Sequence, residues 1–151
     1  MSSHAQSFCR KIDVVTVKGS AIAMPIYTYD TLQQQKFPQL STPKFTNLSL
    51  DDVLQRQAND YDYSLWDNDG DLIQLRKHAT IQFAETFKSG VDAYLIGNWN
   101  IARQKLEEAD RMMVNSDTGG DGPSRTLLNY MGLREWVCPS DWKGYRPLTS
   151  K

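Results

Sequence analysis

The pattern of apolar and polar positions first indicates a pair of strands near the N-terminus. Between residues 8 and 30 the apolar residues are mostly β-branched or aromatic, and the run breaks only at Gly19-Ser20. This pattern predicts a β-hairpin whose turn lies at that break. Pro25 lacks a backbone donor, which favours an edge position for the second strand. Because an isolated hairpin is only marginally stable, we expect residues outside 8–30 to complete the sheet.

Further along the chain the apolar residues adopt a helical period. The spacing from about Leu72 to Leu95 predicts one long helix, and after Gly97-Asn98 it resumes from Trp99 to Met113. These two segments should form a helical hairpin. Pro123 suits the first turn of a third helix over 123–134, because its missing N–H costs nothing there.

The remaining segments are polar or rich in turn residues. Residues 31–48 contain glutamines, prolines, serines and threonines and predict a linker, and Ser49 is placed to cap a short helix at about 50–58. Residues 59–71 predict an acidic loop with aromatic anchors, and the chain should end in an extended tail held by Trp142 and Tyr145. The expected fold class is α+β. Its four expected regions are 1–30, 31–71, 72–134 and 135–151.

Charge, cysteine content and the length of apolar runs indicate which partners and which cellular compartment to expect. Lys and Arg total 17 against 18 Asp and Glu, a net charge of -1, and no segment has the basic stripe that nucleic acid binding requires. Cys9 and Cys138 have neither metal-ligand spacing nor a disulfide-dense context, which favours a reduced, intracellular setting. No apolar run approaches the length of a membrane span. We therefore expect a soluble intracellular protein that binds no nucleic acid.

An acidic segment at Asp67-Asn68-Asp69-Gly70-Asp71 has the look of a calcium loop. With Gly70 at the sixth position of such a loop, Leu65 and Arg76 fall at the first and twelfth positions. Those positions require an oxygen ligand and a bidentate glutamate, so an acidic turn is the better interpretation. His4 and His78 have no neighbouring ligand pattern either, and we expect no metal site.

The two predicted strands carry a resemblance to a known family. Cys9-Arg-Lys-Ile-Asp-Val-Val-Thr-Val-Lys-Gly-Ser, followed by Met24-Pro-Ile-Tyr-Thr-Tyr-Asp, resembles the terminal hairpin of class III adenylyl and guanylyl cyclases. The resemblance spans about 25 residues. It implies that Lys18 contacts the nucleotide phosphates when a complete cyclase domain is present. Within the isolated chain, a solvated lysine at a hairpin end is the better interpretation.

The same resemblance implies that this chain has no catalytic residues of its own. In the family, two aspartates that hold two Mg or Mn ions, and the asparagine and arginine of the transition state, lie upstream of the hairpin. None of these motifs fits within residues 1–7. The resemblance therefore implies no cofactor for this chain and no turnover without a longer parent or a complementing partner.

A second resemblance lies in the predicted helical hairpin. The segment from Gly90 to Ala109 is similar to a tetratricopeptide repeat, a unit that normally stacks with further copies to bury its apolar face. Thr86 stands where the repeat often has tryptophan. The matching positions, which we predict to support a protein-binding surface, are Gly90, Tyr94, Gly97, Trp99, Ala102, Leu106 and Ala109.

Both resemblances follow the order found at the end of cyclases that carry C-terminal tetratricopeptide repeats, as in ciliates. Two functions remain open. The chain is either a non-catalytic interaction or scaffold module in a larger assembly, with a cilium or axoneme implied by the resemblance alone, or the end of an active cyclase that uses ATP or GTP. The start at Met1 favours the first. Partners are expected at the helical hairpin and at the open edge of the β-hairpin.

Overall fold

The structure is a computed structural model that describes residues 9–20, 22–30, 49, 51, 68–114 and 119–148. These residues form a small three-stranded sheet and four helices, which confirms the predicted α+β class. The predicted linker at 31–48, almost all of the short helix predicted at 50–58, and residues 59–67 of the acidic loop lie outside the described residues.

The predicted β-hairpin is confirmed. Strand β1 (Arg10–Val17) pairs antiparallel with β2 (Met24–Thr28), with Val14 opposite Pro25 and a register shift at Ile12. The turn begins at Lys18 and needs a left-handed backbone at Gly19, where φ is 87°. The N–H of Ser20 donates to the carbonyl of Val17 at 3.0 Å and closes the turn.

The third strand comes from the C-terminal tail. Strand β3 (Arg146–Leu148) lies parallel to β1, and the sheet order is β2-β1-β3. The expectation that residues outside the hairpin complete the sheet is therefore met within the chain, with β2 at an edge as Pro25 predicted. The tail was expected to be extended, but its pairing with β1 was not predicted.

The single long helix predicted over 72–95 is wrong, because the structure has two helices in that region. Helix α4 (Gly70–Arg76) begins at Asp69, whose carboxylate accepts from the N–H groups of Asp71 and Leu72. Helix α5 (Ile81–Leu95) begins after Thr80, whose hydroxyl accepts from the N–H of Phe83. The hydroxyl cap offers the backbone an alternative to continuing the helix, and the chain turns at 77–80.

Two further helices follow the prediction closely. Helix α6 (Trp99–Met112) begins at Asn98, whose side-chain oxygen accepts from the N–H of Ile101. Helix α7 (Gly122–Gly132) has Pro123 in its first turn and Asp121 as its cap. Helix α6 packs against both α5 and α7. A three-helix layer results.

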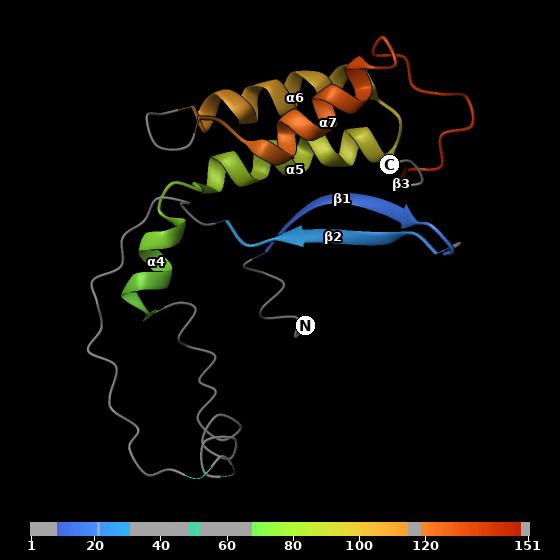
Figure 1. The fold of residues 1–151 in the computed structure, drawn as a ribbon. Helices are drawn as coiled ribbons and strands as arrows, with labels where there is room; N and C mark the ends of the chain where they lie inside the picture. The colour runs from blue at the N-terminus through green and yellow to red at the C-terminus, as the bar shows by residue number, and fades with distance from the viewer. Residues whose placement is uncertain are drawn as a thin grey trace.

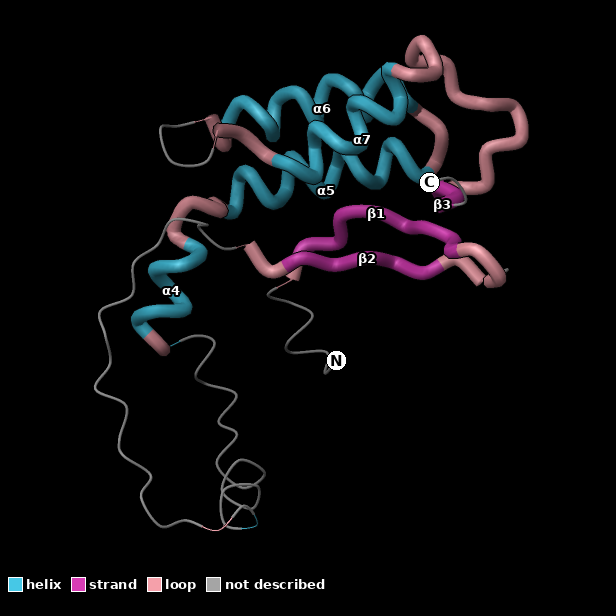
Figure 2. The backbone as a smooth tube through the Cα atoms, viewed as in Figure 1, coloured by secondary structure: helices cyan, strands magenta, loops and turns pink. Residues whose placement is uncertain are grey.

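The three helices lie over one face of the sheet, and α5 contacts β1 (Figures 1 and 2). Helix α4 stands apart from this layer, on the side of the molecule where β2 ends. The core lies between the helices and against β1. Its buried apolar residues are Phe83, Phe87, Val91, Ala93, Tyr94, Trp99, Ala102, Leu106, Ala109, Met113, Leu127 and Met131.

Candidate interaction surfaces

The seven residues that match a tetratricopeptide repeat come together inside the helical hairpin. Gly90 lets α5 and α6 approach closely, since a Cβ placed there would lie 2.9 Å from Cγ of Leu106. Tyr94 stacks on Trp99 with ring centroids 6.1 Å apart. Gly97, with φ of 85°, forms the turn between the helices. Ala102, Leu106 and Ala109 are fully buried along α6.

Their burial limits what these residues can do at a surface. Except for the half-buried Gly97, all of them are enclosed by the chain itself. They hold the two helices in a fixed relation, but they offer no side chain to a partner. Any binding surface of this region must therefore be made by neighbouring exposed residues.

Aromatic side chains from α7 and from the C-terminal tail pack on the helical hairpin. Sequence analysis did not predict these contacts. Trp142 of the tail donates from Nε1 to the carbonyl of Leu95 at 3.1 Å. Its ring packs edge-on against Tyr94 and Trp99, with centroids 5.1 and 5.4 Å away. Tyr130 of α7 lies 6.2 Å from Tyr94. The prediction that Trp142 holds the tail therefore identified the anchor, but not its partners.

An ionic cluster joins the sheet to α7. The Arg10 guanidinium pairs with Asp30 at 2.7 Å and with Asp121 at 2.8 Å, and its Cζ lies 4.0 Å from the ring centroid of Phe87. Burial opposes the charge of Arg10, but its hydrogen bonds to the two carboxylates outweigh burial and raise its pKa. This cluster is structural, since Arg10 and the two carboxylates pair with one another inside the fold.

A second buried pair fastens β3 to β1. Arg146 lies 2.8 Å from Oδ2 of Asp13, while Oδ1 of Asp13 accepts from the N–H of Val14. Burial raises the pKa of the Asp13 carboxyl, and Arg146 only partly offsets the effect. Burial likewise raises the pKa of Tyr94, and the negative charge of Asp13 raises it further. Asp13 and Arg146 also border a cavity of about 270 Å³ between the hairpin and α7.

Lys18 lies at the tip of the hairpin, where its side chain is exposed. It forms no ion pair or side-chain hydrogen bond with another described residue. Within the described ranges no three His, Cys, Asp or Glu side chains gather as a metal site would require. None of the described helices is both long and apolar enough to span a membrane.

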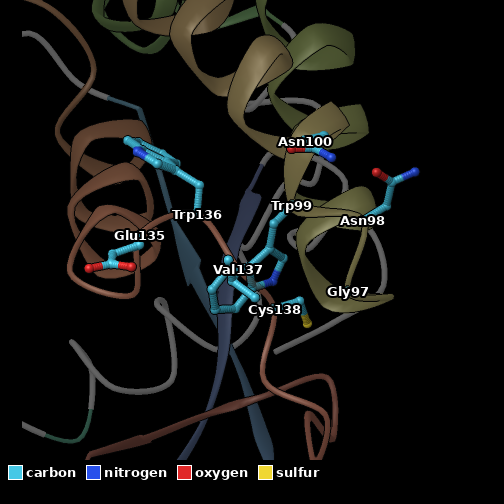
Figure 3. A pocket seen from close by; sticks show the side chains of 8 residues that line it. All are labelled: Gly97, Asn98, Trp99, Asn100, Glu135, Trp136, Val137 and Cys138. Atoms are coloured by element: carbon cyan, nitrogen blue, oxygen red, sulfur yellow. The ribbon is translucent and has the colours of Figure 1, made fainter.

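A notch lies where the turn between α5 and α6 meets the segment that follows α7 (Figure 3). Its volume is about 420 Å³. Figure 3 shows Trp136 and Val137 on one side and the start of α6 on the other. The lining residues are Gly97, Asn98, Trp99, Asn100, Glu135, Trp136, Val137 and Cys138.

The apolar side chains beside the notch are unusually open to solvent. Ile96 is 81% exposed and Val137 is 67% exposed. The two residues precede Gly97 and Cys138 in the chain. These two positions are close in space, because a Cβ at Gly97 would lie 3.1 Å from the Cys138 sulfur. Sequence analysis missed this site, because residues about 40 positions apart carry no shared motif.

The outer edge of β2 is the second exposed feature. No described strand pairs with that edge, since the sheet order places β2 outermost. Met24 and Tyr27 on this strand are 43% and 38% exposed, and Ile22 in the preceding turn is 73% exposed. The edge therefore combines a free strand with apolar side chains.

Comparison of the chain with protein-family models, curated proteins and solved structures finds no match in any of the three. The fold and its surfaces thus define an α+β protein. Its resemblance to cyclases and tetratricopeptide proteins stays a prediction.

Proposed function

We propose that this chain is a non-catalytic protein-interaction module that contributes a folded unit to a larger assembly. The exposed edge of β2, with Met24, Tyr27 and the nearby Ile22, is the observation that carries this proposal. Natural proteins rarely leave an apolar edge strand uncovered, because such an edge pairs with other chains. A ciliary assembly is the setting that the resemblance to ciliate cyclases implies.

Pro25 determines how a partner would contact this edge. It faces Val14 in the sheet and has no N–H to donate, so continuous strand pairing along β2 would lack one hydrogen bond. The contact therefore relies on exposed side chains at the edge more than on the backbone. Met24 and Tyr27 are three residues apart and so lie on opposite faces of the sheet, and a partner that covers the edge can contact both.

Affinity purification from the cells that express the protein tests the proposal. The tagged chain is compared with a Met24→Lys/Tyr27→Lys double variant and with an Ile81→Lys control, which changes an apolar residue on α5 that is 79% exposed. We expect quantitative mass spectrometry to find a protein captured by wild type and control but depleted at least about tenfold with the double variant. Equal recovery with all three chains would sink the proposed edge contact.

The second candidate is the terminal segment of an active nucleotidyl cyclase. Its support is the exposed Lys18 at the tip of a hairpin, in the position that the family resemblance assigns to a phosphate contact. Under this candidate a longer parent or a separate chain supplies the two metal-binding aspartates. The metal ions would then be Mg or Mn, bound by that other segment.

Incubation of the purified chain with ATP or GTP and Mg or Mn separates the candidates in part. We expect no cyclic nucleotide above the background of a Lys18→Ala variant, since the chain lacks the metal and transition-state motifs. Turnover by the 151-residue chain alone would overturn the non-catalytic proposal. A search of the gene for an upstream reading frame with the metal aspartates tests the cyclase candidate separately.

A further inference from the structure

The C-terminal tail, residues 138–148, docks on parts of the chain that lie far before it in the sequence. Trp142 donates from Nε1 to the carbonyl of Leu95 at 3.1 Å, and its ring lies against Tyr94 with centroids 5.1 Å apart. Strand β3 at the end of the tail pairs with residues 15–17 of β1. These contacts reach α5 and β1. The tail of a second copy could make every one of them.

The docking site on β1 is specific for this tail because of a buried charge. Arg146 donates to Oδ2 of Asp13 from Nε at 2.9 Å and from Nη2 at 2.8 Å. Asp13 is 3% exposed. A buried carboxylate that loses its cation is strongly destabilising, so a segment that replaces the tail must bring a basic residue to the same place. The tail of another copy of this chain meets that requirement exactly as its own tail does.

The segment that joins α7 to the tail is strained. Glu135 and Trp136 have φ of 53° and 65°, a left-handed backbone that residues other than glycine rarely adopt in succession. This backbone turns the chain back on itself, and the N–H of Trp136 donates to the carbonyl of Met131 at 3.0 Å. Strain of this kind persists only where the surrounding structure enforces it. A strained hinge of this length favours exchange of the segment that follows it.

The tail is long enough to reach a second copy. Its 11 residues span at most about 36 Å when fully extended. In an exchanged dimer each tail makes on the other copy the contacts that it makes within one chain, while both hinges open and release their strain. Association costs translational and rotational freedom, so we expect the dimer to form at high protein concentration.

We propose that two copies of this chain form a dimer by exchanging their C-terminal tails. Trp142 and Arg146 of each copy dock on the other copy, beside its Tyr94 and its Asp13. The dimer carries two β2 edges, which raises the avidity for a partner that presents its binding site more than once. This inference goes beyond the proposed function, because the exchange uses β1 and α5 and leaves the β2 edge open.

Refolding of the wild-type chain from urea at low and at high protein concentration tests whether the dimer forms. We expect gel filtration with light scattering to find a species of twice the monomer mass after refolding at high concentration. The Met24→Lys/Tyr27→Lys double variant should dimerise like wild type, because β2 takes no part in the exchange. A wild-type chain that stays monomeric under both conditions would overturn the inference.

The hinge provides a second measurement. Glu135→Gly removes the penalty of the left-handed backbone in the closed chain, so we expect the dissociation constant of the dimer to rise about fivefold or more. Glu135→Ala removes the same side chain but keeps the penalty, and it should dimerise like wild type. Equal dissociation constants for the two variants would contradict the role assigned to the hinge.

Two charge-reversed chains test whether the tails are the exchanged segments. In Asp13→Lys and in Arg146→Glu the buried pair has like charges, both in the monomer and in a dimer of identical chains. When the two variants are refolded together, only a heterodimer with exchanged tails has opposite charges at both sites. We expect native mass spectrometry to find mainly this heterodimer.

The Asp13→Lys/Arg146→Glu double variant is the control, because it restores opposite charges within one chain and should behave like wild type. A mixture of the two single variants that equals the sum of the separately refolded chains would overturn tail exchange, even if wild type dimerises. Neither result affects the affinity purification that tests the β2 edge through Met24 and Tyr27. Failure of the exchange is thus distinguishable from failure of the proposed function.

Discussion

The Arg10 guanidinium lies 2.8 Å from Oδ1 of Asp121 and thereby joins the first residue of β1 to the cap of α7, 111 positions later in the chain. Asp121 is almost fully buried, and its Oδ2 also accepts from the N–H of Ser124. The Asp121 carboxylate thus caps α7 and also pairs with Arg10 of β1. The packing of the hairpin on the helices depends on this contact.

Replacement of Arg10 with methionine should therefore destabilise the whole fold. The substitution leaves the buried Asp121 without its cation, a change that typically costs about 3–5 kcal/mol. We expect urea denaturation to show a free energy of unfolding lower by that amount. Arg125→Met removes an arginine that pairs with Asp110 from a half-exposed position and should cost about 1 kcal/mol or less. Equal losses for the two variants would contradict the assigned role of Arg10.

Gly90 should tolerate no side chain. A Cβ at this position lies 2.9 Å from Cγ and 3.2 Å from the backbone N of Leu106, so α5 and α6 must separate. We expect Gly90→Ala to lower the free energy of unfolding by about 1–3 kcal/mol, as overpacking does. Gly70→Ala at the start of α4 meets no atom within 4 Å and should be neutral or slightly stabilising in the same denaturation experiment. A neutral Gly90→Ala variant would show that the helices are not in close contact.

Asp13 should make stability depend on pH in an unusual direction. Burial raises the pKa of its carboxyl, so the folded state binds a proton more readily than the unfolded chain. Its contribution is present at pH values below the ordinary aspartate pKa of about 3.9 and is lost as the pH rises through the higher folded pKa. Protonation by mild acid should thus favour the folded state at this site.

Comparison with Asp13→Asn isolates this contribution. The amide of the variant is neutral at every pH, so the variant lacks the pH dependence that the Asp13 carboxyl contributes. The advantage of wild type over the variant should grow as the pH falls from about 7 to about 4. Thermal denaturation at several pH values measures the difference. An advantage that shrinks over this range would mean that Arg146 lowers the pKa of Asp13 more than burial raises it.

Local signals were enough to predict the hairpin and two of the helices. Gly19 marks a turn that needs positive φ, and Asn98 and Pro123 mark helix starts by simple hydrogen-bond chemistry. The break before α5 was missed because Leu75, Ala79 and Phe83 keep helical spacing across it. Thr80 was the available signal, as a capping hydroxyl three residues before Phe83.

Long-range contacts were beyond prediction from the sequence. Strand β3 is three residues long and contains Pro147, so it has no alternating pattern of its own, and it pairs with residues about 130 positions earlier. The notch could not be predicted for a similar reason. Glu135 and Trp136 have positive φ, but neither is a glycine, the residue that usually indicates such a backbone. Sequence analysis found the residues that build the helical hairpin, but it did not identify the exposed residues around them.

Hydrogen exchange on the chain bound to its captured partner tests the central claim, an interaction through the β2 edge, most directly. We expect amide exchange to slow over residues 24–28 in the complex relative to the free chain, while residues 81–85 at the start of α5 exchange at the same rate in both. Unchanged exchange over 24–28, with protection confined to other segments, would contradict the account.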